Sequence, residues 1–479
     1  MNGVNPRFDF RAPVPDLVEL GAVHFIAIGG AGMSGVARVM LARGCRVSGS
    51  DAKDSPVMTA LAAEGATVWV GHDPAHLEGV ETVVISSAVR EGNPELAAAR
   101  ERGLRVLHRS QALASTMTGS RRVAVAGANG KTTTTSMLTV ALQHCGADPS
   151  FAAGGELAKH GTNAHWGTGD AFVAEADESD GSFLVYRPEV AVVTNVQPDH
   201  LDFYGSFDRV REAYGEFASS VQEGGLLVAC HDDEGSRVLA EQARARGTRV
   251  LTYGWSPHAD VRLGEPHAAG LTSRAGLVDA EGREHELRIT IPGRHNLLNA
   301  TAAFTAATSG LGHDPAGVLE GLFGFTGTRR RFEPKGVAGG VSVVDDYAHN
   351  PGKVAAVVGT GADLVAGQGR LVVVFQPHLY SRTRDFAEEF AAALAPADAV
   401  VLMEVYGARE DPVPGVSSTL IADALRELRP GADVEVVPSW SAVAEVAAGR
   451  ARPGDLVLTV GAGDVTMIGP EVLRVLDRA

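Results

Sequence analysis

Short apolar runs alternate with helical stretches along most of the chain. Near the N-terminus, an apolar strand at 24–28 and the runs ATVWV, TVVISSAV and GLRVLH are interleaved with the helical stretches PVMTALAAEG and NPELAAARERG. The same rhythm returns later in GVSVVDDYAH, GRLVVVFQPH, DAVVLMEVYG, VEVVPS and DLVLTVGAG. Strands that alternate with helices are typical of parallel sheets with helices packed on them. The pattern therefore predicts an α/β protein.

The length of 479 residues is too great for one core and fits three domains of ordinary size. We place an N-terminal domain at residues 1–119, a central domain at 120–332 and a C-terminal domain at 333–479. Residues 224–290 are rich in strand-like segments and carry no chemical signal. We expect sheet and connections there.

A glycine-rich turn in VAVAGANGKTTTT carries the clearest chemical signal. An apolar strand leads into the turn, and a helix with Lys131 and several threonines follows it. Backbone N–H groups of such a turn point at a polyphosphate, while a lysine adds charge and a hydroxyl can bind Mg²⁺. The full eight-residue motif has glycine where Val125 stands, so an ordinary turn with an exposed lysine is the alternative. The expected phosphate contacts are Gly127, Ala128, Asn129, Gly130, Lys131, Thr132 and Thr133.

A second glycine-rich turn lies about a hundred residues upstream, in HFIAIGGAGMSG. Gly30, Gly32 and Gly35 fit the G-x-G-x-x-G spacing between a strand and a helix, and Asp51 follows the next strand. Glycines at these positions allow a diphosphate to approach the helix N-terminus. Both NAD and a UDP-sugar carry a diphosphate, so the turn alone does not identify its ligand.

Acidic side chains follow the apolar run FVAEA of the central domain. Glu175, Asp177, Glu178 and Asp180 fall where the ligand-facing edge of a parallel sheet would lie, and carboxylates there are natural Mg²⁺ ligands. For Asp180, and to a lesser degree Glu178, a solvated acidic turn is the alternative. The buried run VAVVTNV delivers Asn195, Asp199 and His200 to the same edge.

Composition narrows the class of protein. The chain has 45% hydrophobic and 21% charged residues, and no apolar run approaches the length of a membrane span. The formal charge of −16 opposes non-specific nucleic-acid binding. The N-terminus lacks a secretory signal and the three cysteines are far apart, so we expect a cytoplasmic protein without membrane insertion or nucleic-acid binding.

Ten motifs in order make the chain similar to the Mur ligase family. They are HFIAIGGAGMSG, SGSD, ISSAVREGNPEL, GKTTTT, EADESDGSF, TNVQPDHLDFYG, PGRHNLLNATAA, RRRFE, DDYAHNP and FQPHLYSRTRDF. The resemblance implies a Rossmann-like UDP-binding domain, a central P-loop ATPase-like domain and a C-terminal Rossmann-like domain that binds an amino acid. It also implies ATP- and Mg²⁺-dependent amide formation between the carboxylate of UDP-N-acetylmuramate and L-alanine, in peptidoglycan precursor synthesis, by a monomer or homodimer.

The resemblance also implies roles for individual residues. Lys131 would hold the ATP phosphates, Thr132 and Glu175 a first Mg²⁺, and His200 a second. Further nucleotide contacts would be His295, Asn296, Arg330, Arg331 and Asp346, although the pair at 295–296 would unaided pass for a helix cap and the arginines for a basic surface. The catalytic set would be Lys131, Glu175, His200, His349 and Arg382. The substrate-binding set would be Gly30, Ala31, Gly32, Met33, Ser34, Asp51, Ser86, Ser87, Ala88, Asn163, Tyr347, His349 and Arg382.

Several positions depart from the family pattern. Ala128 and Asn129 replace a threonine–histidine pair, Gln197 a glutamate, Asn350 a histidine and Leu379 an arginine. These departures leave open a ligase for another amino acid or a recycled peptide, and a weakly active paralogue. Two other classes are a nicotinamide oxidoreductase, which would leave GKTTTT without a role, and a non-catalytic UDP-sugar binder.

Overall fold

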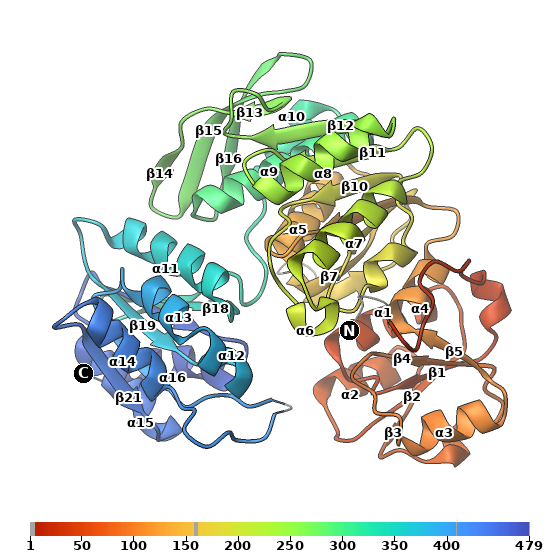
Figure 1. Cartoon of the computed structure of the whole chain (residues 1–479), viewed down its shortest axis with the longest axis horizontal. Helices are drawn as coiled ribbons and strands as arrows, with labels where there is room; N and C mark the ends of the chain where they lie inside the picture. Colours follow the sequence, from red (N-terminus) through yellow and green to blue (C-terminus); the bar gives the residue numbers. More distant parts are fainter. Residues whose placement is uncertain (1–4, 158–160, 409, 479) are drawn as a thin grey trace. The chain divides into compact units, whose positions relative to one another are not determined.

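The computed structural model describes residues 5–157, 161–408 and 410–478. Within these residues the strands form three sheets, of five, eleven and six strands, and each is flanked by helices (Figure 1). The predicted α/β class is confirmed. By internal contacts the chain divides into two compact units: Met1–His267, Arg274–Thr290 and Asn296–Thr326 form the first, and Ala268–Ser273, Ile291–His295 and Gly327–Ala479 the second.

The first sheet is fully parallel and has the strand order β3-β2-β1-β4-β5. Its strands are β1 (Val23–Ile26), β2 (Val47–Asp51), β3 (Thr67–Val70), β4 (Thr82–Ile85) and β5 (Arg105–His108). Its helices are α1 (Ala31–Ala42), α2 (Pro56–Ala63), α3 (Pro94–Glu101) and α4 (Arg109–Thr116). The strand expected at 24–28 ends earlier because Ala27 has a φ of +65°, which breaks the extended backbone.

Side chains from α1, α2 and α4 pack on one face of this sheet, and their apolar core continues into the central sheet. Leu96 of α3 packs on the opposite face, with Ile26 and Ile85. The N-terminal and central sheets thus share one core within the first compact unit.

The central sheet has the order β14-β15-β13-β12-β11-β10-β6-β9-β7-β8, with β16 paired to β15. Its strands are β6 (Arg121–Ala126), β7 (Ser150–Leu157), β8 (Thr162–His165), β9 (Ala171–Glu175), β10 (Val190–Val193), β11 (Leu226–Cys230), β12 (Arg249–Gly254), β13 (Val261–Leu263), β14 (His267–Ala269), β15 (Thr272–Val278) and β16 (Glu284–Ile289). Its helices are α5 (Lys131–His144), α6 (Leu201–Tyr204), α7 (Phe207–Ser219), α8 (Glu234–Ala245), α9 (Arg294–Thr305) and α10 (Pro315–Phe323).

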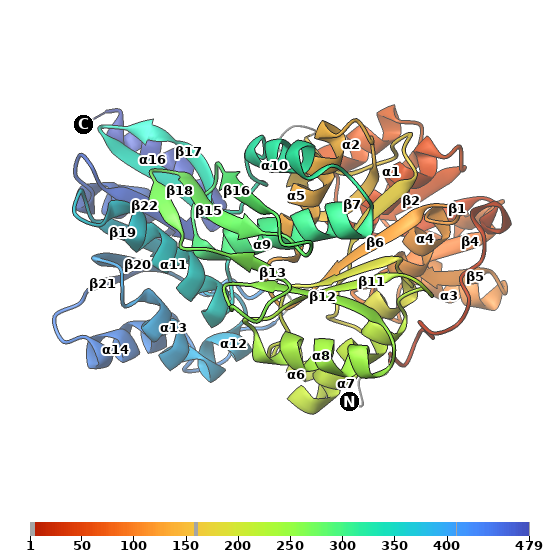
Figure 2. The same cartoon turned by 90° about the horizontal axis from the view of Figure 1, so that it is seen from above.

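The strands from β7 to β13 across the middle of this sheet are parallel, so the carboxyl ends of β6, β9 and β10 meet at one edge. Helices α7 and α8 cover one face and α5 and α10 the other (Figure 2). Residues 224–290 hold β11 to β16 with one helix, α8, which agrees with the expected sheet and connections.

The C-terminal sheet has the order β17-β18-β22-β19-β20-β21, and only the β17–β18 pair is antiparallel. Its strands are β17 (Glu333–Ala338), β18 (Val341–Asp346), β19 (Leu371–Phe375), β20 (Ala399–Met403), β21 (Asp433–Val437) and β22 (Leu456–Val460). Its helices are α11 (Pro351–Val365), α12 (Tyr380–Asp385), α13 (Ala387–Leu394), α14 (Thr419–Leu428), α15 (Trp440–Arg450) and α16 (Ile468–Leu476). Apolar side chains of α11, α13 and α14 form one core and those of α15 and α16 another, on opposite faces.

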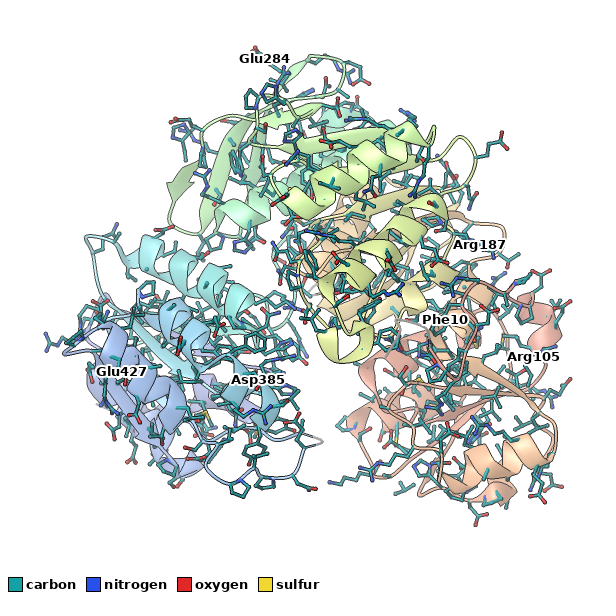
Figure 3. The ribbon with its side chains drawn as sticks, in the orientation of Figure 1. Phe10, Arg105, Arg187, Glu284, Asp385 and Glu427 are labelled. Atoms are coloured by element: carbon teal, nitrogen blue, oxygen red, sulfur yellow. The ribbon has the colours of Figure 1, made fainter. Side chains whose placement is uncertain are left out.

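Charged side chains line the surface of both units, as Arg105, Glu284 and Glu427 illustrate (Figure 3). Among the described residues, no helix is both long and apolar enough to cross a bilayer.

Candidate active site

The glycine-rich turn predicted to bind phosphate joins β6 to α5. Gly127 has a φ of +139° and Gly130 a φ of +84°, a region that favours glycine. A Cβ atom at Gly127 would collide with Oγ1 of Thr194, and one at Gly130 would lie 2.5 Å from Oδ1 of Asn299. Both glycines are therefore required by geometry. The turn leads directly into the N-terminus of α5, as a polyphosphate cradle requires.

Residues that follow β10 hold this turn from one side. The side chain of Asn195 accepts a hydrogen bond from the backbone N–H of Asn129 (2.9 Å) and donates one to its carbonyl oxygen (3.0 Å). The Asn129 side chain in turn donates to Oε1 of Gln197 (3.0 Å). Two of the departures from the family pattern, Asn129 and Gln197, therefore contact each other.

Lys131 begins α5, and its Nζ donates to the carbonyl oxygen of Gly127 (2.6 Å) and to Oε1 of Glu178 (2.9 Å). Burial by itself would lower the pKa of Lys131, but the charges of Glu178, Asp177 and Glu175 outweigh it and raise the pKa above its usual value. The lysine is thus a fixed cation beside the turn.

The acidic loop that follows β9 is buried over part of its length. Glu178 is 2% exposed and Asp180 8%, so the alternative of a solvated acidic turn is wrong for both. Burial raises the pKa of Glu178 against the opposing attraction of Lys131. Residues distant in the sequence pack against this loop and account for its burial. Tyr204, for example, donates from its hydroxyl to the carbonyl oxygen of Glu178 (2.6 Å).

The predicted metal ligands lie around the same loop. Glu175 ends β9 and accepts a hydrogen bond from the N–H of Gly154 (2.6 Å). His200 has its Nε2 3.9 Å from Oε1 of Glu178, and Thr132 is buried in the first turn of α5. The described residues contain no ready-made group of three His, Cys, Asp or Glu ligands for a metal. The oxygen donors of this set, Thr132 and Glu175, nonetheless fit Mg²⁺, which binds proteins through one or two side chains and takes its other oxygens from phosphate and water.

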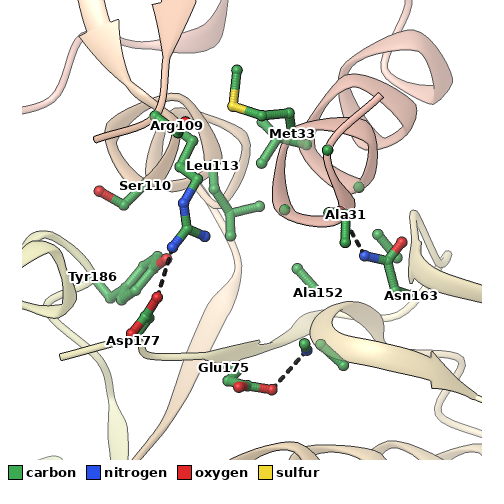
Figure 4. Close-up of a pocket in the computed structure, with 18 residues that line it drawn as sticks. Ala31, Met33, Arg109, Ser110, Leu113, Ala152, Asn163, Glu175, Asp177 and Tyr186 are labelled. Carbon is green, nitrogen blue, oxygen red and sulfur yellow. Dashed lines mark hydrogen bonds and ion pairs between the residues drawn. The ribbon is translucent and has the colours of Figure 1, made fainter. Parts of the chain in front are cut away.

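A cavity of about 270 Å³ opens between the N-terminal sheet and the central sheet (Figure 4). Residues of the N-terminal part that line it include Gly30, Ala31, Gly32, Met33, Ser86 and Arg109. Residues of the central part include Ala152, Gly154, Asn163, Glu175, Asp177 and Tyr186. The cavity thus runs from the second glycine-rich turn to the carboxylate of Glu175, and it brings together predicted substrate and metal residues.

Arg109 also lines the cavity, although no sequence motif had singled it out. Its Nη2 donates to Oδ2 of Asp177 across the cavity wall (2.8 Å; Figure 4). Burial by itself would raise the pKa of Asp177, but Arg109 and Lys131 outweigh it and lower the pKa. The available signal was the position of Arg109 directly after the strand β5, at the edge where parallel strands present their ligand contacts.

The other predicted sugar-nucleotide residues support the first glycine-rich turn or lie beside it. Asp51 accepts from the N–H of Gly29 (3.0 Å), and Ser34 donates to the carbonyl oxygen of Ala31 (3.1 Å). Asn163 also donates to the Ala31 carbonyl (2.8 Å). Ser87 and Ala88 are exposed and do not line the cavity, although Ser86 does.

The predicted adenine contacts begin α9. Because this helix starts at Arg294, His295 and Asn296 lie in its first turn, and the helix-cap alternative does not hold. Asn299 donates to Oδ1 of Asn296 (3.3 Å), and the same Asn299 lies against Gly130. Asn296 therefore lies near the phosphate turn. His295 is exposed and belongs to the second compact unit.

In the second unit, Asp345 and Asp346 end β18. Asp346 accepts from the N–H groups of Phe332 and Ala348 (2.7 Å each), and burial raises its pKa. Arg330 donates to the carbonyl oxygens of Gly461 (2.7 Å) and Gly463 (3.2 Å).

The guanidinium carbons of Arg330 and Arg331 lie 4.7 and 5.4 Å from the ring centre of Tyr347. Arg330 is thus tied into the second unit, and the alternative of a freely solvated basic run does not describe it.

The predicted amino-acid contacts gather beyond β18 and β19. Arg382 donates to the carbonyl oxygen of His349 (3.1 Å), and the His349 ring lies 5.7 Å from that of His378. Burial, with the charges of Lys353 and Arg382, lowers the pKa of His349 to about 3, so this imidazole is neutral at neutral pH. Leu379 precedes α12 with a φ of +72°.

Asn350 caps α11 by accepting from the N–H of Lys353 (2.9 Å). Asparagine is a preferred residue at this position, which explains how one departure from the family pattern fits the fold.

Three family models match the chain in sequence order. Residues 22–121 match the Mur ligase family catalytic domain, residues 125–307 the Mur ligase middle domain, and residues 330–463 the Mur ligase glutamate ligase domain.

Individual proteins agree with these matches. The chain is 57% identical to a protein named UDP-N-acetylmuramate–L-alanine ligase from Kineococcus radiotolerans, over 97% of this chain and 98% of that one. It is 55% identical to a protein of the same name from Acidothermus cellulolyticus, over 97% of each chain. A crystal structure of UDP-N-acetylmuramate-alanine ligase from Thermotoga maritima superposes with a TM-score of 0.79 at 30% identity, over 95% of this chain and 98% of that one. The chain therefore belongs to the Mur ligase family.

Proposed function

We propose that this protein is an ATP-dependent ligase that joins L-alanine to the carboxylate of UDP-N-acetylmuramate and releases ADP and phosphate. The observation that carries the proposal is that one cavity has a diphosphate-type glycine turn at one end and Glu175, beside the Lys131 turn, at the other. A substrate with a diphosphate and a carboxylate fits such a cavity. Relatives at 51–57% identity carry the name of this reaction.

The chemistry requires activation because a carboxylate oxygen is a poor leaving group. An oxygen of the lactoyl carboxylate forms a bond to the γ-phosphorus of ATP while the bond to the β,γ-bridging oxygen breaks, which yields ADP and an acyl phosphate. The amine nitrogen of L-alanine then bonds to the acyl carbon, the carbon–oxygen bond to phosphate breaks, and the amine loses a proton. Such phosphoryl transfer needs positioning and charge neutralisation above all.

The turn Gly127–Gly130 and the N-terminus of α5 provide the site for the ATP phosphates in this proposal. Lys131 supplies a positive charge, and its raised pKa keeps it protonated at neutral pH. Thr132 and Thr133 stand in the first helical turn, and Asn296 lies near Gly130 through Asn299. Thr132, Glu175 and His200 would hold Mg²⁺, which lowers the repulsion between the two reacting anions.

The glycine turn Gly30–Ser34 would bind the diphosphate of the sugar nucleotide at the N-terminus of α1. Asp51 supports that turn through its hydrogen bond from the N–H of Gly29. Ser86 and Asn163 line the cavity beside the turn, and Ser87 and Ala88 directly follow Ser86. Arg109 adds a guanidinium group in the same cavity, where it suits a phosphate or a carboxylate oxygen.

For the amino acid we propose Tyr347, His349 and Arg382 of the second unit, where a neutral imidazole and a guanidinium group suit an amine and a carboxylate. Asp346 would face the ribose of ATP, and its two backbone hydrogen bonds hold its carboxyl group in place. Arg331, His295 and Arg330 are the remaining proposed nucleotide contacts. The monomer-or-homodimer state and the cytoplasmic location stay predictions from the sequence.

Phosphate release tests the proposal directly. Purified protein is mixed with ATP, Mg²⁺, UDP-N-acetylmuramate and L-alanine, and each component is omitted in turn. We expect release only in the complete mixture, together with a product whose mass equals the two substrates joined with loss of water. Release that needs neither the muramate nor an amino acid would contradict ligation. Replacing L-alanine by glycine, L-serine or a tripeptide then decides between this ligase and one for another amine.

A further inference from the structure

Asp180 is buried in a cluster of polar groups although it does not line the cavity. Its Oδ2 accepts a hydrogen bond from the hydroxyl of Ser87 and lies 3.2 Å from Nε2 of His108. Its Oδ1 accepts from the backbone N–H of Ser182 (3.1 Å). Ser87 follows β4 and His108 ends β5 of the N-terminal sheet, whereas Asp180 belongs to the acidic loop that follows β9 of the central sheet. The cluster therefore joins the two sheets.

The hydrogen bonds of His108 determine which of its ring nitrogens carries the proton in the neutral form. The backbone N–H of Ser110 donates to Nδ1 of His108 (3.3 Å), so a neutral imidazole carries its proton on Nε2, which faces Asp180. The rings of Phe8 and Phe10 lie 5.2 Å from this imidazole. Burial alone would raise the pKa of Asp180, but His108, Ser182 and Ser87 outweigh it and hold the pKa well below its usual range. Asp180 is therefore a stable buried anion.

The residue before Ser87 and the residue after His108 line the cavity, and residues near Asp180 contact Arg109 and Lys131. Ser86 precedes Ser87, and Arg109 follows His108; both line the cavity. On the same loop as Asp180, Asp177 is paired with Arg109 (2.8 Å). Glu178, which lies between Asp177 and Asp180 in the sequence, is paired with Lys131 (2.9 Å).

The spacing along the loop explains what Asp180 can do. Asp177 and Asp180 both face the start of α4, whereas Glu178 faces the phosphate turn. The loop is thus held at two points, by His108 at the end of β5 and by Arg109 at the start of α4. The orientation of Arg109 in the cavity therefore depends on a carboxylate that does not touch the ligand.

We propose that Asp180 is a positioning residue for the sugar-nucleotide cavity, in which it holds the acidic loop against Ser87 and His108 so that Arg109 and Ser86 face the ligand. This inference rests on the proposed function for the identity of that ligand. If Asp180 had only a structural role, its substitution would lower the stability of the protein alone. If Asp180 is a positioning residue, its substitution weakens the binding of the sugar nucleotide more than that of ADP.

The test compares two isosteric variants, Asp180→Asn and Asp279→Asn. Asp279 is a matched control because it is also a buried aspartate of the first unit, 4% exposed and 2.8 Å from a histidine nitrogen, that of His285. It belongs to the β15–β16 hairpin and does not line the cavity. Calorimetry measures the binding of UDP-N-acetylmuramate and, separately, of ADP with Mg²⁺, and thermal unfolding gives Tm for each variant.

We expect Asp180→Asn to weaken sugar-nucleotide binding roughly tenfold or more, while ADP binding changes by less than about threefold. The lost charge holds the loop against Ser87 and His108, whereas the Glu178–Lys131 pair at the phosphate turn stays in place. Asp279→Asn should lower Tm and leave both affinities near those of the wild type. In turnover, Asp180→Asn should raise KM for the sugar nucleotide by a larger factor than it lowers kcat. Wild-type sugar-nucleotide binding by Asp180→Asn, or an equal loss of both ligands, would overturn the proposal.

His108→Gln provides a second variant, since it removes the Nε2 partner of Asp180, leaves the carboxylate in place and changes no residue of the proposed substrate-binding set. It should show the same selective loss with a smaller factor, and it decides the question if Asp180→Asn does not fold. Wild-type protein that binds UDP-N-acetylmuramate but forms no amide would contradict the proposed function while the Asp180 comparison still stands. Wild-type protein that does not bind the sugar nucleotide contradicts both.

Discussion

Lys131 and Glu178 form an ion pair with 2.9 Å between Nζ and Oε1, and their side chains are only 13% and 3% exposed. Lys131 opens the helix that follows the phosphate turn, and Glu178 comes from a loop 47 residues later. A γ-phosphate that binds this lysine therefore competes with a carboxylate already in contact with it. The ammonium group is held in place by the same contact before any phosphate binds.

Lys131→Ala should lower kcat by a factor that corresponds to about 3 kcal/mol, the scale of losing one preorganised electrostatic group. Folding should persist, because the raised pKa of Glu178 allows that carboxyl group to take up a proton once the lysine is gone. Phosphate-release kinetics and circular dichroism measure the two effects. Lys335→Ala is the control, since Lys335 forms an ordinary ion pair with Glu333 at 2.8 Å. Near-normal turnover by Lys131→Ala would remove this lysine from the proposed mechanism.

Gly127→Ala should abolish nucleotide binding, whereas Gly146→Ala should not. Both glycines have a positive φ, +139° and +75°, but a Cβ at Gly127 meets Thr194 and one at Gly146 meets nothing within 4 Å. Gly146 follows the other end of α5, so its substitution should lower the free energy of unfolding by about 1 kcal/mol without touching the turn. Titration with a fluorescent ADP analogue measures affinity for each variant. Equal affinities for the two would show that the turn does not bind phosphate.

Arg109→Met should raise KM for the sugar nucleotide on the order of tenfold to a hundredfold, because it removes charged donors from the cavity and leaves Asp177 without its partner. KM for ATP should change less. Arg38→Met serves as the control, since Arg38 pairs with Glu64 at 2.9 Å outside the cavity. A larger effect on KM for ATP than for the sugar nucleotide would assign Arg109 to the other substrate.

Glu95→Gln should destabilise the protein at neutral pH by up to roughly 3 kcal/mol, the equivalent of its pKa shift. Glu95 is fully buried, and His24, Ser50 and His76 surround its carboxylate, with His72 at 3.2 Å and the Asp73 N–H at 3.2 Å. Burial alone would raise the pKa of Glu95, but these partners outweigh it and lower the pKa from 4.5 to about 2.

Because the pKa of Glu95 is lowered on folding, the pH range in which Glu95 stabilises the protein can be stated. A lowered pKa stabilises the fold above the unfolded-state value, and the stabilisation is lost as pH falls from about 4.5 towards about 2. Urea unfolding of wild type and Glu95→Gln should therefore show a gap that is constant from pH 7 to 5 and narrows below. Glu64→Gln, which removes a surface ion pair, should show a gap under about 1 kcal/mol throughout. A Glu95→Gln gap that widens on acidification would contradict the assigned direction.

The elements that repeat a local pattern could be predicted from the sequence. Strand–turn–helix signals gave the phosphate turn around Gly127 and the diphosphate-type turn around Gly30, because strand apolarity, glycine spacing and the following helix are all encoded within about twenty residues. The α/β class followed from the same repetition. The domain boundaries at 119/120 and 332/333 and the roles of the individual site residues stay predictions.

Features that depend on a distant partner could not be predicted. Asp180 and Glu178 look like a polar turn locally, and only Ser87, His108 and Lys131, brought close by the fold, explain their burial. Arg109 belongs to no motif, and its place in the cavity depends on how α4 packs beside the acidic loop. A single sequence carries no signal for such pairings.

The hydrogen bond between the side chains of Asn129 and Gln197 has a consequence for titration experiments. Both groups are amides, which neither gain nor lose protons in the range where the protein is folded. Their 3.0 Å contact at the phosphate turn is therefore the same at pH 6 and at pH 9, and it is insensitive to ionic strength. This contact therefore contributes nothing to a pH dependence of nucleotide affinity, which reports instead on the nucleotide and on the ionisable groups that contact it, Lys131 and Glu178 among them.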